Sequence, residues 1–303
     1  MSNIAVIILT FNEERHVKRA INSVCEVCSE VIVVDSGSND RTVEIAKANG
    51  AKVFINKWTN YANQFQWALD NTKVSSEWIL RLDADEYVSR DLIDEIRLRL
   101  PRIGADVSGI TVSLRYIFMG RKIKYGGRKL ELLRLFRNRK ARIESRWMDE
   151  HIVLLDGQLS QFQGSIYDSN EKGLNFFIEK HNHYSTREAV DILNKKYGLF
   201  SFDKLIKSGA SSNQAIVKRF IKEKIYNEMP FWIGPLMYFL FRYVLMLGFL
   251  DGRRGLIYHF LQGYWYRFLV GAKVYEFDRE LKPLSSSQER CERLEQLTGY
   301  KFS

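Results

Sequence analysis

Residues 4–35 read IAVIILTFNEERHVKRAINSVCEVCSEVIVVD, and this stretch decides the fold class. The run Ile4–Leu9 is continuously apolar and of strand length, as expected for a strand that is covered on both faces. From Glu13 to Val24, apolar residues recur at three- and four-residue spacing, which predicts an amphipathic helix. A second apolar run of strand length follows at Val31–Val34. The stretch therefore predicts one strand–helix–strand unit of a parallel sheet.

The same alternation continues as far as residue 82. It predicts, in order, a helix, a strand, a helix and a strand, over Arg41–Ala48, Lys52–Ile55, Tyr61–Leu69 and Trp78–Leu82. Alternation this regular indicates a doubly wound, mostly parallel α/β sheet, and such sheets bind ligands at the carboxyl ends of their strands.

The pattern changes after Pro101. Two further strands are predicted, over Val107–Phe118 and Ile152–Leu159. From about residue 171 the pattern is helical, with helices predicted over 171–181, 187–206 and 214–226 and a long apolar and aromatic region over 231–277. We therefore predict two domains, residues 1–168 containing the sheet and residues 169–303 containing the helices.

Composition narrows the class of protein. The 303 residues are 46% hydrophobic with mixed charge, which excludes intrinsic disorder, and three cysteines exclude a disulfide scaffold. The N-terminus turns acidic too early for a signal peptide, so we expect a reduced, intracellular protein. Cys25 and Cys28 form a CxxC without a second pair or a histidine cluster, and we interpret them as ordinary helix-end cysteines, not as a zinc site.

The charge is strongly basic, and it suggests three kinds of partner. A formal net charge of +10 fits nucleic acid, an anionic membrane surface or a phosphorylated substrate. Residues 115–146 contain twelve Lys and Arg but only two acids, which is also typical of a solvated loop-and-hairpin face. The chain contains no nucleic-acid-binding motif, so no nucleic-acid partner is expected, although a basic nucleic-acid-binding protein remains the alternative class.

Two polar segments follow the first two predicted strands. Thr10–Glu14 has no glycine, which excludes a dinucleotide fingerprint or a P-loop, and Asn12 is a candidate helix N-cap. In Asp35–Asp40 a carboxylate on a turn of small residues is suited to hydrogen-bond a base or a ribose. An ordinary capped turn between strand and helix is the alternative interpretation of the second segment.

The strongest chemical signal is Asp83-Ala84-Asp85-Glu86, which follows a buried strand. Three acids at one strand end repel one another unless a positive group lies among them. Strand alternation places Asp83 and Asp85 on the same side, where both can reach one ligand. Carboxylates together with substrate phosphates are the ligands that Mg²⁺ and Mn²⁺ prefer. A solvated acidic turn that begins a helix is the alternative.

A further acidic point lies at Asp149-Glu150-His151, at the end of the basic stretch. Adjacent carboxylates and an imidazole before a strand are suited to act as a general base and an additional metal ligand. An acidic surface turn without function is the alternative.

These segments, in this order, resemble the family 2 glycosyltransferases of the GT-A fold. The matching residues are Thr10–Glu14, Asp35–Asp40 and the DxD motif, here DADE, at Asp83–Glu86. Tyr125–Gly127, followed by Leu133–Arg137 and by Glu150-His151, looks like bacterial lipopolysaccharide-core and exopolysaccharide members. The resemblance covers about residues 3–160, which makes residues 1–168 the expected nucleotide-sugar-binding catalytic domain.

The resemblance implies transfer of a sugar from a nucleotide-sugar, usually a UDP-sugar, to a hydroxyl, with inversion and with Mn²⁺ or Mg²⁺. Thr10, Phe11 and Glu13 are then expected to line the base and ribose pocket, and Asp35 to contact the base. The full set expected to bind the donor is Thr10, Phe11, Asn12, Glu13, Asp35, Gly37, Gln64, Asp83, Ala84 and Asp85. For Gln64, an exposed helix surface is the alternative.

The resemblance also implies the metal ligands and the base. Asp85 is the expected ligand of the metal on the diphosphate, Asp83 is expected to hold the ribose or the metal, and His151 is a further candidate metal ligand. Glu150 is the expected catalytic base and Asp149 the alternative, since many relatives carry Glu-Asp at this point. A nucleotidyltransferase is disfavoured, because residues 10–16 lack the glycine-rich loop that holds a triphosphate. A non-catalytic nucleotide-binding protein is disfavoured because the acids are intact.

The apolar C-terminal region suggests a membrane surface. Phe231–Leu250 has about the ~20 residues of a bilayer span, but Arg242 near its centre argues against a simple span. We expect a peripheral or monotopic enzyme at the cytoplasmic face of a bacterial inner membrane. A helical hairpin packed in the core or against a second copy, as a homo-oligomer, is the alternative. Arg134 and Arg137 are then expected to bind phosphates of a lipid-linked, lipopolysaccharide or exopolysaccharide acceptor.

Overall fold

The computed structural model describes residues 3–127, 130–144, 151–200 and 230–302. The chain divides into two compact units. Unit 1 is formed by Met1–Ile123, Arg128–Ser145 and Asp149–Gly173, and unit 2 by Lys124–Gly127, Arg146–Met148 and Leu174–Ser303. The main division therefore follows Gly173, and the short loop Lys124–Gly127 belongs with the helical unit.

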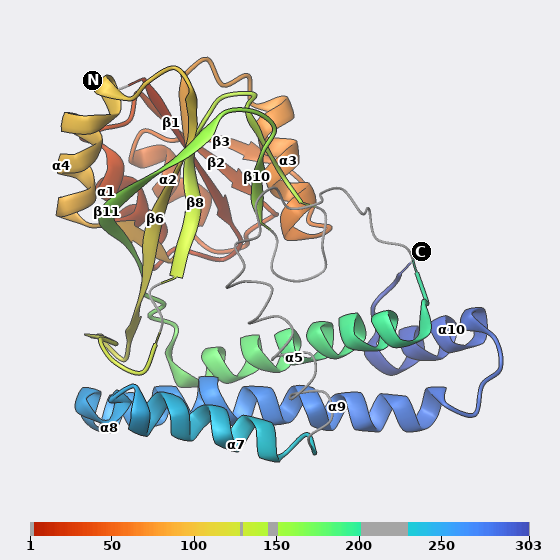
Figure 1. Cartoon of the computed structure of the whole chain (residues 1–303). Coiled ribbons are helices and arrows are strands. Elements are labelled where there is room, and N and C mark those ends of the chain that lie inside the picture. Colours follow the sequence, from red (N-terminus) through yellow and green to blue (C-terminus); the bar gives the residue numbers. More distant parts are fainter. Residues whose placement is uncertain (1–2, 128–129, 145–150, 201–229, 303) are drawn as a thin grey trace. The chain divides into compact units, whose positions relative to one another are not determined.

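Unit 1 is built on one mixed sheet with the strand order β3-β2-β1-β4-β8-β6-β11-β5 (Figure 1), and β7 pairs with β6 at its side. A separate two-stranded sheet contains β9 and β10. The strands are β1 (Ile4–Thr10), β2 (Glu30–Asp35), β3 (Lys52–Ile55), β4 (Trp78–Asp83), β5 (Glu86–Val88), β6 (Val107–Phe118), β7 (Arg121–Lys122), β8 (Leu130–Arg137), β9 (Ala141–Ile143), β10 (Ile152–Leu154) and β11 (Gln158–Asp168).

Strand β1 explains why its sequence is apolar throughout. Ile4, Val6 and Ile8 pack in one cluster with helices α1 and α4, while Ile7 and Leu9 pack in a second cluster with α3. Successive side chains of a strand point to opposite faces, so a strand covered on both faces needs apolar residues at every position. The helices of unit 1 are α1 (Val17–Val24), α2 (Thr42–Ala48), α3 (Tyr61–Asn71) and α4 (Arg90–Arg99), with the 3₁₀ turn η1 (Leu100–Arg102) after α4.

Strands β1 to β4 pair in parallel, as predicted, and β6 and β11 form a further parallel pair. The second half of the sheet adds antiparallel pairs: β8 with β4 and with β6, and β5 with β11. The single strand predicted over residues 152–159 is wrong. The chain turns at Gly157, which has a φ of 87° that favours glycine, and continues in a different sheet as β11.

The secondary-structure elements described in unit 2 are all helical. They are α5 (Gly173–Tyr197), α7 (Ile233–Leu240), the π-helical η2 (Phe241–Leu245), the 3₁₀ segment η3 (Gly248–Asp251), α8 (Gly252–His259), the π-helical η4 (Phe260–Trp265), α9 (Tyr266–Leu281) and α10 (Ser287–Thr298). The helices predicted over 171–181 and 187–206 form one helix, α5, as far as Tyr197. Residues 214–226 lie outside the described residues.

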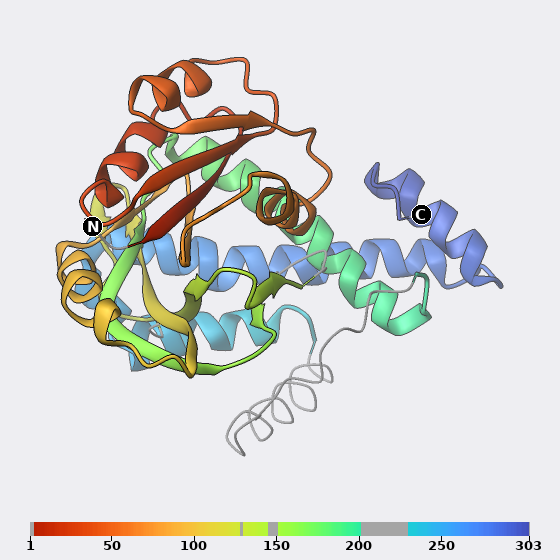
Figure 2. The ribbon, with the colours of Figure 1, turned by 90° about the horizontal axis from the view of Figure 1, so that it is seen from above.

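A small core joins helices α5, α9 and α10 of unit 2. Ala189, Val190 and Leu193 of α5 pack against Phe277 and Leu281 of α9, and Leu294 of α10 completes the cluster. Figures 1 and 2 both show α10 turning back beside the C-terminal end of α9. The turn ends in a capping box, in which Ser286 and Glu289 satisfy each other's backbone N–H groups at the start of α10.

Arg242 has a structural partner inside unit 2. Its Nε donates to the carbonyl oxygen of Gly126, and the Gly126 N–H donates to the Met246 carbonyl at 2.8 Å. Asp251 accepts the Lys124 and Tyr125 N–H groups at 3.0 and 2.9 Å. The arginine in the apolar stretch therefore fixes the Tyr125–Gly127 motif, and this contact accounts for a charge at that position.

No single helix in the described ranges is long and apolar enough to cross a bilayer. The segments Ile233–Leu245 and Gly248–Leu281 meet the length and composition test only as a pair, and the pair is bent by 72°.

Candidate active site

The loops after β1 and β2 meet at one end of the sheet because their strands pair in register. Thr10 lies opposite Asp35, and on the other side of β1 Leu9 lies opposite Asp83. The carboxyl ends of β1, β2 and β4 therefore bring three of the predicted segments to one edge. A ligand at this edge would contact all three, as in other open α/β sheets.

Asp35 organises its own turn. Its Oδ2 accepts from the hydroxyls of Thr10 at 2.7 Å and Ser38 at 2.5 Å, and its Oδ1 accepts from the N–H groups of Gly37 at 2.9 Å and Ser38 at 2.7 Å. A carboxylate has about four lone-pair sites, and these bonds use all of them. Both Asp35, fully buried, and Thr10, 3% exposed, are turned away from solvent. The predicted base contact of Asp35 is therefore corrected to a role in shaping the turn.

Asn12 joins the two loops. It has a left-handed φ of 55°, its N–H donates to Ser38 Oγ at 2.8 Å, and its Oδ1 accepts the Asn39 N–H at 3.0 Å. The predicted helix N-cap is therefore wrong. Helix α1 begins at Val17 after a separate turn, and the Asn12 amide caps the neighbouring loop instead. Phe11 beside it is 56% exposed, an apolar ring at the surface of this edge.

Gln64 is buried, in contrast to both of its predicted positions. Its Nε2 donates to Ser36 Oγ and to the Asn56 carbonyl, each at 3.1 Å, and its Oε1 accepts from Asn56 Nδ2 at 2.7 Å. The side chain is fully enclosed by these partners. Gln64 therefore holds the loop after β2 in place through Ser36 and Asn56. It was predicted either to contact the donor or to lie on an exposed helix surface, and its buried position fits neither prediction.

Asp83, at the end of β4, lies among cations that the protein itself supplies. Tyr61 donates its hydroxyl to Asp83 Oδ1, and Arg81 donates from Nε to the same hydroxyl at 2.8 Å. Arg81 Nε and Arg134 Nη1 each lie 3.7 Å from a carboxylate oxygen of Asp83. The positive group that the acidic motif requires is therefore provided for Asp83 by two arginines.

Glu86 is paired with Arg134 in the interior of unit 1. Arg134 Nη2 lies 2.6 Å from Glu86 Oε1, with both side chains less than 5% exposed, and Glu86 Oε2 accepts the Asp83 N–H at 2.9 Å. Burial raises the pKa of the Glu86 carboxyl, and the Arg134 charge opposes that rise. The guanidinium and the carboxyl group therefore form a buried hydrogen-bonded pair inside unit 1.

Arg134 and Arg137 do not form the predicted acceptor contact. Arg134 is buried against Glu86, because β8 is an interior strand of the sheet and not part of a solvated hairpin. Arg137 donates from Nε to the Val107 carbonyl at 2.8 Å and pairs with Glu77. Both side chains therefore hold unit 1 together, and the prediction that they bind acceptor phosphates is wrong.

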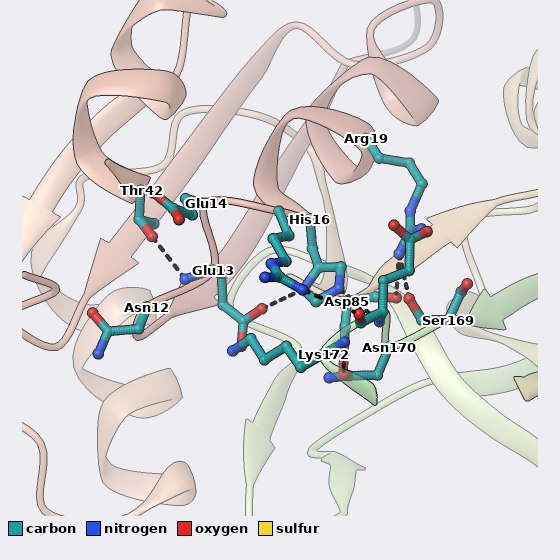
Figure 3. A network of polar contacts seen from close by, with 12 residues as sticks. Asn12, Glu13, Glu14, His16, Arg19, Thr42, Asp85, Ser169, Asn170 and Lys172 are labelled. Atoms are coloured by element: carbon teal, nitrogen blue, oxygen red, sulfur yellow. Dashed lines mark hydrogen bonds and ion pairs between the residues drawn. The ribbon is translucent and has the colours of Figure 1, made fainter. Parts of the chain in front are cut away.

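Asp85 lies in the turn between β4 and β5, and a segment that follows β11 holds it (Figure 3). Its Oδ2 accepts from Asn170 Nδ2 at 3.0 Å, and its backbone carbonyl accepts from Ser169 N–H at 3.0 Å and Arg19 Nη2 at 3.1 Å. Ala84, between the two aspartates, is buried in the core behind the turn. The oxygen chemistry of Asp85 fits Mg²⁺ or Mn²⁺, which take one or two protein carboxylates together with phosphates and water.

A preassembled group of three metal ligands is not present among the described residues. Asp83, Asp85 and His151 are therefore not preassembled as one group, and their roles as metal ligands stay predictions. His151 is exposed at the start of β10, where its carbonyl accepts the Glu144 N–H at 2.9 Å.

Comparison with known proteins places this geometry in a family. Residues 5–153 match the model of "Glycosyl transferase family 2". A glycosyltransferase of uncharacterised function from Rickettsia bellii is 30% identical over 302 residues, covering 94% of this chain and 90% of the relative. The chain belongs to glycosyltransferase family 2. The predicted family, enzyme class and GT-A fold are thereby confirmed.

Two further comparisons name proteins to which this glycosyltransferase is similar. The "Lipopolysaccharide core biosynthesis glycosyltransferase LpsC" of Rhizobium meliloti is 27% identical over 291 residues, covering 90% of this chain and 92% of the relative. A glucosyl-3-phosphoglycerate synthase from Mycobacterium tuberculosis, crystallised with Mn²⁺ and uridine diphosphate, aligns with a TM-score of 0.31 and 21% identity. That alignment covers 38% of this chain and 44% of the synthase chain.

Several residues of the glycosyltransferase site were not predicted. Tyr61, Arg81 and Asn170 contact the acidic motif or its partners, yet none belongs to a motif of its own. Arg134 was predicted to contact the acceptor and instead contacts Glu86 of the acidic motif. Arg81 did carry a signal, because a charge inside a strand that is otherwise apolar requires a buried partner. The expected base Glu150 and its alternative Asp149 lie outside the described residues and remain predictions.

Proposed function

We propose that this glycosyltransferase moves a sugar from a UDP-sugar to a hydroxyl of a lipid-linked or phosphorylated glycan, with inversion and with a divalent cation at Asp85. The observation that supports the proposal best is the register of β1, β2 and β4, which brings Thr10–Glu13, Asp35–Ser38 and Asp83–Asp85 to one edge. A lipopolysaccharide or exopolysaccharide acceptor is consistent with the printed name of the relative LpsC.

The chain's own residues then have distinct tasks. Asp83, oriented by Tyr61 and the two arginines, accepts a ribose hydroxyl, and Phe11 and Glu13 border the base and ribose. Asp85 would hold Mn²⁺ or Mg²⁺, which supplies positive charge for the leaving diphosphate. Glu150, or Asp149 in its place, takes the proton of the acceptor hydroxyl as that oxygen attacks the anomeric carbon.

We further propose that unit 2 binds the surface of an anionic bilayer as a peripheral or monotopic element, on the cytoplasmic face of a bacterial inner membrane. Large apolar side chains are exposed one after another from α7 to η3, and clustered exposed apolar side chains are typical of protein or membrane interaction sites. They are Leu236, Met237, Leu240, Phe241, Val244, Leu245, Met246, Leu247, Phe249 and Leu250. Arg253 and Arg254 follow directly, and cations beside an apolar helical face favour anionic lipid.

The donor proposal is tested by release of UDP from a panel of UDP-sugars, with and without Mn²⁺, and with GDP- and dTDP-sugars as controls. We expect release from one or a few UDP-sugars that requires the metal and is lost in Asp85→Ala. Equal release without metal, or release from a different nucleotide class only, contradicts the donor proposal.

The membrane proposal has its own test, binding to vesicles that contain anionic lipid. We expect co-sedimentation that weakens when Leu245 and Leu250 are both replaced by Ser. A protein that stays in the supernatant as a stable dimer would assign the apolar face to a second copy of the chain. The matched control is Leu98→Ser, which removes an apolar side chain that is 65% exposed in unit 1 and is expected to leave vesicle binding unchanged.

A further inference from the structure

The segment Ser169–Lys172, which reads SNEK, contacts two predicted donor-site residues although it carries no recognised motif. It follows β11 directly and precedes α5. Figure 3 shows it between the Asp85 turn and the loop after β1. Ser169 and Asn170 contact Asp85, and Lys172 contacts Glu13. One short segment therefore fixes acids that come from two different motifs.

Asn170 is oriented by its own turn. Its Oδ1 accepts the Lys172 N–H at 2.9 Å, so its Nδ2 is the atom that faces Asp85 Oδ2, at 3.0 Å. The Asn170 amide fixes the direction of the Asp85 carboxylate by this hydrogen bond, and unlike a lysine or an arginine it adds no full positive charge. This is the kind of support that a metal-binding carboxylate commonly has, because its negative charge must remain available to the cation.

Lys172 and His16 hold Glu13 from both sides. Lys172 Nζ lies 2.6 Å from Glu13 Oε1, and His16 Nδ1 lies 2.6 Å from Glu13 Oε2. His16 is fully buried, and its Nε2 accepts the Glu171 N–H at 2.9 Å, which assigns the proton to Nδ1. Glu13 also receives a backbone anchor, since its N–H donates to Thr42 Oγ1 at 2.7 Å. Its carboxylate is therefore fixed in one direction.

We propose that Asn170 and Lys172 are positioning residues of the donor site. Asn170 acts through Asp85 on the end that carries the metal and the diphosphate, and Lys172 acts through Glu13 on the nucleoside end. This inference rests on the proposed function, because it needs UDP and a divalent cation as ligands. Since both residues belong to one segment, the two ends of the donor site are set by the same piece of chain.

The two residues predict different signatures in a titration of UDP with and without Mn²⁺. Asn170→Ala weakens UDP binding about 10-fold or more in the presence of Mn²⁺ and leaves metal-free binding unchanged, since supporting contacts of metal ligands typically contribute 10- to 100-fold. Lys172→Ala weakens binding by the same factor with and without metal. Asn22→Ala, at an exposed asparagine of α1, is the matched control and is expected to bind like wild type.

The outcomes separate this inference from the proposed function. A wild-type protein whose UDP binding does not depend on Mn²⁺ contradicts the proposed function itself. A metal-dependent wild type together with an Asn170→Ala variant of unchanged metal dependence overturns the role of Asn170. A Lys172→Ala effect confined to Mn²⁺ overturns the role of Lys172. Thermal unfolding of each variant shows whether it is folded, and Asn170→Ser, whose shorter side chain falls short of Asp85, repeats the test if Asn170→Ala does not fold.

Discussion

Replacing Arg134 by methionine tests whether this arginine is an internal partner of the acidic motif. Arg134 and Glu86 form an ion pair at 2.6 Å with both side chains less than 5% exposed, and Arg134 also lies 3.7 Å from Asp83. Removing one partner of a buried pair leaves an uncompensated charge, which costs about 3–5 kcal/mol of unfolding free energy. With an m-value of about 3 kcal/mol per molar urea, the unfolding midpoint falls by roughly 1–2 M.

The assay is urea unfolding followed by tryptophan fluorescence, with two companion variants. The double variant Arg134→Met/Glu86→Gln is expected to recover about half of the loss or more, because burying a neutral amide is less costly than burying an unpaired carboxylate. Arg121→Met, at an exposed arginine of β7, is expected to stay within about 0.5 kcal/mol of wild type. If Arg134→Met is as stable as wild type and only raises the KM of an acceptor, the internal role is refuted.

Three other predictions concern single sites. Gly126→Ala should lower the unfolding free energy of unit 2 by about 1–3 kcal/mol, measured by thermal melting. Gly126 has a left-handed φ of 69°, and an added Cβ would lie 2.4 Å from the His259 side chain. The control is Gly120→Ala, which has a similar φ of 74° but no neighbouring atom within 4 Å and should therefore cost less. Burial, with a neighbouring arginine, lowers the pKa of His259 to about 4. The unfolded chain therefore binds the proton at a higher pH than the folded protein, so the melting temperature should fall as the pH drops from about 6.5 towards 4. The melting temperature of His259→Gln should depend less on pH. The same pH dependence in wild type and His259→Gln would contradict this prediction. Cys25 is exposed, whereas burial raises the pKa of Cys28 to about 11, so mass spectrometry after maleimide treatment at pH 8 should find Cys25 modified and Cys28 intact until the protein unfolds.

The parallel half of the sheet was predictable because its signals are local. Ile4–Leu9 and Val31–Val34 are apolar runs, and the helix between them has a clear amphipathic period. The antiparallel half was harder to predict, because β8 is placed by pairing with β4 and β6, which are distant in the sequence. A strand that carries two arginines also looks solvent-exposed until a buried partner such as Glu86 is known.

The positions of the site residues were predictable, but their roles were not. Asp35 and Asp83 each follow a predicted strand, and the carboxyl ends of parallel strands lie at one edge of a sheet, as the pairing of β1 with β2 and β4 shows. Whether a polar side chain faces a ligand or supports a loop depends on its hydrogen-bond partners, which come from other segments. Asp35 and Gln64 are satisfied internally, and Asn170 approaches Asp85 from 85 positions further along the chain, so no local pattern identified them.

Calorimetric titration of UDP with and without Mn²⁺, on wild type and on Asp85→Ala, measures whether a cation at Asp85 mediates donor binding. We expect that wild type binds UDP tightly only when Mn²⁺ is present, that GDP and dTDP bind more weakly, and that Asp85→Ala removes the metal dependence. Binding of UDP that is unaffected by both the metal and the substitution would contradict the assignment of Asp85 as the residue that holds the cation at the donor site.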